Sequence, residues 1–275
     1  MPLSRRAPIR EGRKAIPFDR GEGPALIVIP GVQGRWEWMR PALRALQATC
    51  RTITYTLCGD AGAGMTFDRA LGFENYMRQL DDVFEKTGIA RAALCGVSYG
   101  GFIALRYAAT RPERVSALVL VSAPAPGWTP SARQKRYLAR PWLSAPAFVA
   151  TAPGRVWPEI ASALPDWRSR LTFTVRHSAQ VVSAPMIPSR MASRVQLQQA
   201  SDFGDDPRKV RAPTLIVTGE DNLDQVVPPP VTRWYLDLIP GSRYEKLAGT
   251  GHIGMLTQPK RFAEIVSVFV HAHSH

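Results

Sequence analysis

Cysteine, histidine and long apolar runs are all scarce in this chain of 275 residues. The three cysteines, Cys50, Cys58 and Cys95, are odd in number and lack metal-ligand spacing, so we expect small core or loop residues in a reducing compartment. No apolar run approaches the roughly 20 residues of a membrane span, and the N-terminal 20 residues lack the apolar centre of a signal peptide. These absences favour a cytoplasmic protein without a membrane span.

Acidic residues are also few. The chain has 22 acidic and 35 basic side chains, which gives a net charge of +13. Nearly all of the excess lies in two segments, residues 1–20 and 127–211. The basic residues stand singly and form no run of four or five, which favours a solvated basic surface over a nucleic-acid site. We therefore expect a small-molecule substrate and no nucleic-acid partner.

Short apolar runs alternate with segments of helical spacing along most of the chain. Runs such as ALIVI and VSALVLV have strand length, and their continuous apolar character is typical of strands covered on both faces. This alternation predicts an α/β fold with a mostly parallel central sheet and helices on both faces. The predicted strands are residues 25–29, 51–57, 91–97, 115–121, 213–218 and 243–247.

The alternation breaks after residue 126. Residues 127–211 hold four of the seven tryptophans and many prolines, and their helix-like pieces are residues 131–140, 159–171 and 190–200. The segment is too long for a simple crossover between strands. It predicts an inserted helical cap of residues 127–211, within a core domain made by residues 1–126 and 212–275.

The sequence GVSYG at residues 96–100 joins a predicted strand to a predicted helix. A serine on such a sharp turn projects its hydroxyl above the sheet edge, and the flanking Gly96 and Gly100 avoid collisions with the adjoining elements. The helix that follows offers free backbone N–H groups, of which that of Tyr99 comes first. Ser98 is thus predicted to be a nucleophile on a nucleophile elbow.

A serine nucleophile requires a histidine to take its proton and a carboxylate to orient that histidine. His252 is the candidate base, because it lies in a glycine-containing loop directly after the last predicted strand. The loop after strand 213–218 offers three carboxylates, which are Glu220, Asp221 and Asp224. The other four histidines lie in the predicted cap or at the C-terminal end: His177, His271, His273 and His275.

With a serine, an acidic loop and a histidine in this order, the chain resembles the α/β-hydrolase fold superfamily, and capped serine hydrolases most of all. The resemblance covers about residues 25–270. In that superfamily the acid usually precedes a Val-Pro pair, and counting back from Val227-Pro228 selects Asp224, whereas counting forward from Gly219 reaches Asn222. The resemblance therefore favours Asp224 over Asp221, with Glu220 last.

The resemblance also implies an oxyanion hole of two backbone N–H groups. One belongs to Tyr99 and the other to Val32, in the loop after strand 25–29. That loop usually reads His-Gly-x in the superfamily and here reads Pro30-Gly31-Val32. Gln33 is a candidate to supplement the hole, although a surface glutamine is the simpler interpretation.

These residues predict a serine hydrolase that cleaves a carboxylic ester or similar acyl bond of a mostly apolar small molecule. Serine in place of aspartate argues against the capped dehalogenases and epoxide hydrolases. The resemblance leaves open a carbon–carbon bond hydrolase, a lactonase, a perhydrolase, or a ligand-binding protein without turnover. No dinucleotide cofactor is expected, since the glycines of residues 59–64 lack the order of a dinucleotide fingerprint. No metal is expected either, because the cysteines lack ligand spacing and the histidine-rich HAHSH end is interpreted as a short tail. The sequence does not specify an oligomeric state.

Overall fold

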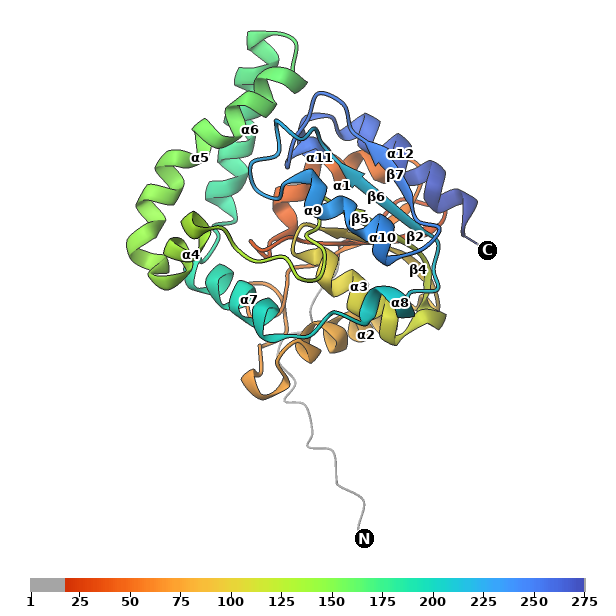
Figure 1. Ribbon diagram of the computed structural model, residues 1–275. Coiled ribbons are helices and arrows are strands. Elements are labelled where there is room, and N and C mark those ends of the chain that lie inside the picture. The colour runs from red at the N-terminus through yellow and green to blue at the C-terminus, as the bar shows by residue number, and fades with distance from the viewer. Residues whose placement is uncertain (1–17, 275) are drawn as a thin grey trace.

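A seven-stranded sheet in the order β1-β3-β2-β4-β5-β6-β7 forms the centre of the computed structural model, which describes residues 18–274 (Figure 1). β1 runs antiparallel to β3, and all other neighbouring strands are parallel. The predicted mostly parallel sheet is therefore confirmed. The strands are β1 Phe18–Arg20, β2 Ala25–Ile29, β3 Arg51–Thr54, β4 Ala92–Val97, β5 Val115–Val121, β6 Thr214–Thr218 and β7 Arg243–Lys246.

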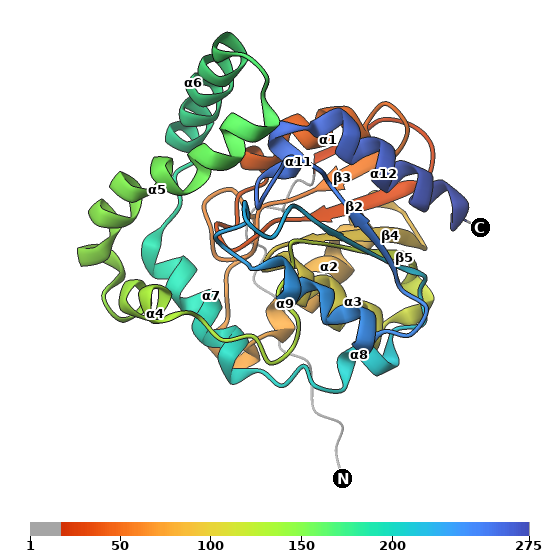
Figure 2. The same cartoon turned by 45° about the horizontal axis from the view of Figure 1, so that its top comes forward.

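Helices cover both faces of this sheet (Figure 2). The helices that pack in the core regions are α1 Arg40–Leu46, α2 Glu74–Thr87, α3 Gly100–Thr110, α9 Pro229–Arg233, α10 Tyr235–Leu238, α11 Gly254–Thr257 and α12 Pro259–Ala272, and the short 3-10 helices are η1 Trp36–Met39, η2 Arg69–Leu71 and η3 Pro112–Arg114.

Alternate side chains of the central strands β2, β4, β5 and β6 enter two separate hydrophobic clusters. Ile27 and Ile29 of β2 pack with α2 and α3 on one face, whereas Leu26 and Val28 pack with α1 and α12 on the other. This alternation is expected because successive side chains of a strand point to opposite faces. Covering both faces explains why these strands are apolar throughout.

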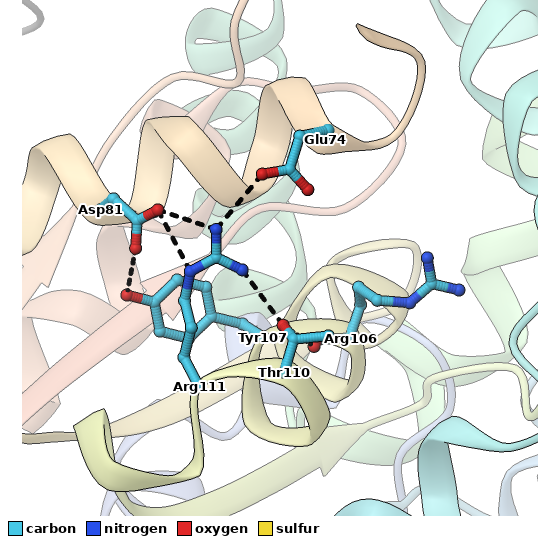
Figure 3. A network of polar contacts seen from close by, with 6 residues as sticks. All are labelled: Glu74, Asp81, Arg106, Tyr107, Thr110 and Arg111. Carbon is cyan, nitrogen blue, oxygen red and sulfur yellow. Dashed lines mark hydrogen bonds and ion pairs between the residues drawn. The ribbon is translucent and has the colours of Figure 1, made fainter. Parts of the chain in front are cut away.

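A polar network fastens α3, the helix that follows Ser98, to α2 (Figure 3). Tyr107 donates its hydroxyl hydrogen to Asp81 at 2.9 Å, and the Arg111 guanidinium bonds the same carboxylate at 2.9 and 3.1 Å. Arg111 also contacts Glu74 at 3.2 Å. Because these bonds hold the C-terminal end of α3, they help fix the direction in which its N-terminal end points.

The chain between β5 and β6 forms five helices, which are α4 Ala132–Ala139, α5 Pro141–Ala163, α6 Trp167–Ser183, α7 Pro188–Ala200 and α8 Asp206–Lys209. We call α4 to α7 the helical insertion. In both views it lies beside the sheet rather than on its faces (Figures 1 and 2). By contrast, α8 packs on α3, where Asp206 pairs with Arg106.

Two expectations for this segment are wrong in detail. Residues 159–171 do not form one helix, because Asp166 caps the N-terminus of α6 and separates it from α5. Conversely, residues 141–158 were not among the predicted helical pieces, yet they form most of α5, which continues through Pro146, Pro153 and Pro158. All three are exposed, so water can bond the carbonyls that each proline leaves unpaired.

Elsewhere the differences are small. Strand β1 was not predicted, and β3 ends at Thr54 instead of residue 57, because Leu57 instead donates its N–H to Gly34 at 2.8 Å. The three cysteines are free and buried, as expected for small core residues. Within residues 18–274, no helix has the length and apolar character needed to cross a membrane.

Candidate active site

Ser98 occupies a strained turn between β4 and α3. Its φ of 52° is left-handed, a conformation that costs a non-glycine residue about 1 to 2 kcal/mol. The turn is possible because its glycines allow close backbone contact. A Cβ on Gly96 would lie 2.6 Å from the Gly100 oxygen, and one on Gly100 would lie 2.5 Å from the Ile29 oxygen. The predicted collisions at both flanking positions are thus confirmed, and the geometry is that of a nucleophile elbow.

The Ser98 backbone is tied to the sheet on the side of β5. Its N–H donates to the Val121 carbonyl at 2.8 Å, which extends the ladder one residue beyond β4. Tyr99 then directly precedes α3. Gly101 and Phe102 donate their N–H groups to the Ser98 and Tyr99 carbonyls at 2.9 and 3.1 Å, which closes the elbow into the first turn of α3. The positive end of the α3 dipole therefore lies at Ser98.

Asp224 and His252 are hydrogen-bonded to each other. The Asp224 Oδ2 and the His252 Nδ1 are 3.1 Å apart, and the Asp224 side chain is fully buried. Asp224 Oδ1 accepts bonds from the Val226 and Val227 N–H groups, both at 2.9 Å. These donors hold the carboxylate in one orientation, so that its second oxygen faces the imidazole.

Burial disfavours the charged imidazolium of His252, but two nearby carboxylates together outweigh this effect. Together with a contribution from Glu159, Asp224 raises the pKa of His252 above its ordinary value. A histidine in this position is a stronger base than one in water. The Nδ1–H tautomer that Asp224 favours leaves Nε2 free to accept a proton.

The other two acidic candidates have different partners. Asp221 is more than half exposed and forms a bidentate pair with Arg233 at 2.6 and 2.8 Å. Glu220 accepts a bond from the Gly249 N–H at 2.8 Å. Of the three carboxylates, Asp224 is therefore the one that the structure brings to His252.

Ser98 follows β4, Asp224 follows β6 and His252 follows β7, so all three lie at the carboxyl edge of the sheet. The two loops that carry Asp224 and His252 pack backbone against backbone. A Cβ on Gly251 would lie 2.5 Å from the Leu223 oxygen, and one on Gly219 would lie 2.4 Å from the Thr250 oxygen. Glycine at both positions is thus what lets the acid and the base approach.

Val32 lies in the loop after β2, beside the elbow. A Cβ on Gly31 would be 3.4 Å from that of Ser98, and the Gly34 N–H closes the turn on the Gly31 carbonyl at 2.9 Å. Val32, Ser98 and Tyr99 line the same cavity. Gln33 is half-buried and is not among the residues that line this cavity.

That cavity has a volume of about 260 Å³ and lies between the sheet edge and the helical insertion. Most of its wall is apolar, and its aromatic members include Trp128 and Phe148. The insertion supplies much of the lining: Gln134, Tyr137, Leu138, Pro141, Ser144, Ala145, Phe148, Val149, Pro188, Met191, Ala192, Val195 and Gln198. An apolar cavity with a few polar side chains in its wall, Ser98 among them, is typical of a small-molecule site.

Residues 26–265 match the model of the alpha/beta hydrolase family. The chain belongs to this family. RutD of Klebsiella pneumoniae (strain 342), provisionally named a carbamate hydrolase, is 28% identical over 250 residues, which cover 88% of this chain and 90% of that protein.

Two solved structures have the same fold as this chain over nearly its whole length. A thermophilic esterase from Thermogutta terrifontis gives a TM-score of 0.74 at 22% identity, covering 94% of both chains. An enol-lactonase from Burkholderia xenovorans LB400 gives 0.72 at 19% identity, covering 92% of this chain and 95% of that one. At these identities the similarity shows the shared fold.

Two charged residues that contact the loops of the site were not predicted from the sequence. Both lie in the helical insertion. Glu159 of α5 is 1% exposed, and its Oε2 accepts the Ile253 N–H at 3.1 Å. Burial raises the pKa of Glu159 to about 7, against the opposing effect of the Ile253 and Gly251 N–H groups. Glu159 is the only acidic residue of α5, and its position in a mostly apolar stretch could have indicated a buried carboxylate.

The second is Arg194 of α7, which is 4% exposed and forms a buried ion pair with Asp60. Its Nη1 also donates to the Val32 carbonyl at 2.9 Å. A buried guanidinium thus fixes the loop that carries Val32. Nothing in the sequence marked this arginine among the many of residues 127–211.

Proposed function

We propose that the protein is a serine hydrolase that cleaves a carboxylic ester, or a similar acyl bond, of a mostly apolar small molecule through an acyl-enzyme on Ser98. The observation that carries the proposal is the Asp224–His252 hydrogen bond at the sheet edge where the elbow presents Ser98 to an apolar cavity. Nucleophilic catalysis by serine requires a serine, a histidine base and a carboxylate that orients the histidine, and the hydrogen bond and the elbow support that arrangement.

In the proposed mechanism, Ser98 Oγ attacks the acyl carbon while His252 Nε2 takes its proton. Asp224 holds the imidazole in the required tautomer and stabilises the imidazolium. The Val32 and Tyr99 N–H groups bond the oxyanion of the tetrahedral intermediate, and loss of one such donor typically costs about 2.7 to 4 kcal/mol of barrier.

Collapse of that intermediate breaks the bond to the leaving alcohol, which receives its proton from His252. Water then enters, gives a proton to His252 and attacks the acyl-enzyme. The second tetrahedral intermediate releases the acid and restores Ser98.

Residues 127–211 act in this proposal as a cap on the core domain of residues 1–126 and 212–275. The cap supplies most of the apolar wall, so it selects the substrate while the core performs the chemistry. A cavity of about 260 Å³ suits a small acyl compound, and its apolar lining disfavours charged substrates.

A lactone is a cyclic ester, so the same residues would open it by the same steps. The fold similarity to an enol-lactonase makes lactones a natural part of the substrate panel. Carbon–carbon bond hydrolysis, perhydrolysis and ligand binding without turnover are the remaining alternatives for this site.

The test is hydrolysis of p-nitrophenyl esters of graded chain length, with a lactone and a diketone in the same panel. We expect Ser98→Ala to abolish turnover and to prevent labelling by a fluorophosphonate. Ser122→Ala is the matched control, because Ser122 is also buried, has a left-handed φ of 42° and follows the neighbouring strand. Full activity of Ser98→Ala would refute the proposal, and tight ligand binding with no turnover would favour a binding protein.

A further inference from the structure

The outer surfaces of α5 and α6 are unusually apolar for helices at the edge of a protein. On α5, Trp142, Val149 and Trp157 are 64%, 58% and 50% exposed. They recur after seven and eight residues, so they share one face of the helix. Val149 also lines the cavity, so the stripe continues to the cavity wall. Leu143, exposed by 77%, adjoins them. The only charged residues of α5 are Glu159, which is buried, and Arg155, which folds back onto Phe148 and Thr151 of the same helix.

Helix α6 carries a matching stripe. Trp167, Leu171, Val175 and Val182 are all more than half exposed, at spacings of four, four and seven residues. The opposite side of α6 faces the core, where His177 packs against Trp38 and Phe173. The exposed stripe is therefore additional to the face that α6 uses for packing.

The two helices that carry these stripes lie at the edge of the molecule. In both views α5 and α6 form the periphery of the molecule on the side away from the C-terminus, and the turn between them projects beyond the body (Figures 1 and 2). Exposed apolar surface of this kind, flanked by polar residues, marks interaction sites because exposure to water is unfavourable.

The charge around the stripes identifies the kind of partner. Residues 131–187 contain eight basic and two acidic residues. Both acids are engaged, since Glu159 is buried and Asp166 caps α6. Six of the basic residues are exposed: Arg133, Lys135, Arg136, Arg140, Arg168 and Arg176. Tryptophan and arginine together favour an anionic lipid headgroup layer, where rings and long basic side chains are both well solvated.

We propose that the outer face of α5 and α6 docks on the surface of an anionic lipid bilayer. A second copy of this chain is disfavoured as the occupant, because pairing the same face would bring the basic side chains beside the stripes, such as Arg140 before α5 and Arg168 over the Trp167 ring, close to those of the other copy. The docked helices would lie in the plane of the interface, without crossing the bilayer.

Docking would place one wall of the cavity at the lipid. Ser144, Ala145 and Phe148 of α5 line the cavity, while Trp142 and Trp157 of the same helix are among its most exposed residues. An apolar compound dissolved in the bilayer would then have a short path to the cavity. The docking itself rests on the exposed residues and holds whatever chemistry Ser98 performs.

The test is sedimentation of the full chain with phosphatidylcholine vesicles prepared with and without phosphatidylglycerol. We expect binding to the anionic vesicles that weakens as salt is added. The double variant Val175→Asp/Val182→Asp should bind these vesicles at least about tenfold more weakly than the wild type. Val268→Asp is the matched control, because Val268 is 73% exposed on α12 and outside the stripes.

Thermal unfolding of each variant reports whether the aspartates disturb the fold. Absence of wild-type binding, equal binding to neutral vesicles, or binding that the double variant retains would each overturn the proposal. A wild-type dimer in sedimentation velocity that the double variant dissociates, without vesicle binding, would assign the face to a second copy.

Discussion

The Glu159 carboxylate accepts a hydrogen bond of 3.1 Å from the N–H of Ile253, the residue that follows His252. Glu159 belongs to the helical insertion, so a residue outside the core touches the backbone of the loop that carries the proposed base. Its other oxygen is buried and has no hydrogen-bond partner among the described residues. The carboxylate thus contributes both an acceptor for this loop and a charge near His252.

Replacing Glu159 by glutamine should separate these two contributions. The amide oxygen still accepts from Ile253, but the charge that helps raise the pKa of His252 is lost. We expect the acid limb of the kcat/KM profile of Glu159→Gln to move to lower pH. Glu159→Ala also removes the acceptor, which costs about 1 to 3 kcal/mol of stability and lowers kcat as well.

Asp166→Asn is the matched control for these measurements, since Asp166 is another carboxylate of the insertion and lies on the surface. Its pH profile should match that of the wild type. An unchanged acid limb in Glu159→Gln would show that the Glu159 charge does not act on the base.

The raised pKa of Glu159 also predicts how stability depends on pH. Because the folded pKa is about 7 and the ordinary value is 4.5, the folded state binds more protons between these values. The contribution of Glu159 to stability is therefore greatest below pH 4.5 and falls as the pH rises to 7, by at most about 3 kcal/mol. Denaturant unfolding gives the free energy of unfolding of the wild type and of Glu159→Gln. As the pH rises from 4.5 to 7, any advantage of the wild type should shrink or reverse.

Asparagine at position 224 should damage the reaction far more than asparagine at position 221. Asp224→Asn keeps the shape but favours the wrong imidazole tautomer, and a loss of kcat of about 10³ to 10⁴ is expected. Asp221→Asn should retain near wild-type kcat, because Asp221 pairs with Arg233 instead of His252. Similar losses in both variants would contradict the geometric assignment of the acid.

The protonation of His252 should set the acid limb of the activity profile. Burial lowers the pKa of His252, but Asp224 and Glu159 together raise it above the ordinary value of 6.5. Only the neutral imidazole can accept the Ser98 proton. The kcat/KM of the wild type should therefore fall below a midpoint above pH 6.5. The remaining activity of Asp224→Asn should have a lower midpoint, and a midpoint that does not move would argue against this coupling.

Removing the Arg194 guanidinium should unsettle the loop of Val32. Arg194→Met leaves Asp60 buried without its partner and the Val32 carbonyl without its donor, at an expected cost of about 3 to 5 kcal/mol. The double variant Arg194→Met/Asp60→Leu should recover part of that stability. Since Val32 also supplies a proposed oxyanion donor, kcat should stay low in the double variant while KM changes little.

Two glycines should respond in opposite directions to alanine. Gly100→Ala places a Cβ 2.5 Å from the Ile29 oxygen, so we expect lost activity and a lower Tm. Gly154 lies inside α5 with nothing within 4 Å of the added Cβ. Gly154→Ala should stabilise the protein by about 0.5 to 1 kcal/mol, because alanine favours a helix more than glycine does. Equal effects of the two substitutions on Tm would contradict this reasoning.

The parts of the fold that the sequence predicted best are those dictated by local patterns. Strands β2 and β5 match their predicted limits, because strands covered on both faces are apolar throughout. The elbow was predictable since the backbone around Ser98 tolerates only glycine at Gly96 and Gly100. Strand β1 has three residues at the sheet edge and too little pattern to detect.

Contacts between distant residues left no such pattern. Glu159 and Ile253 are 94 positions apart, and Arg194 and Val32 are 162 apart. Nothing local distinguishes a buried charge from an exposed one in an arginine-rich segment. Asp224 required a comparison with a family pattern, because the residues of its loop leave Glu220, Asp221 and Asp224 equivalent until their partners are known.

The contacts of Glu159 and Arg194 mean that the helical insertion cannot simply be exchanged for that of another family member. A chimera that takes residues 127–201 from a relative would keep the elbow and the Asp224–His252 pair, yet it would lose the acceptor for Ile253 and the donor to Val32. Grafting a cap between family members would then disturb the loops of Val32 and His252, and activity would be lost even when the new cavity fits its substrate. Transplanting these two side chains with the helices that carry them would be the minimum for a working hybrid.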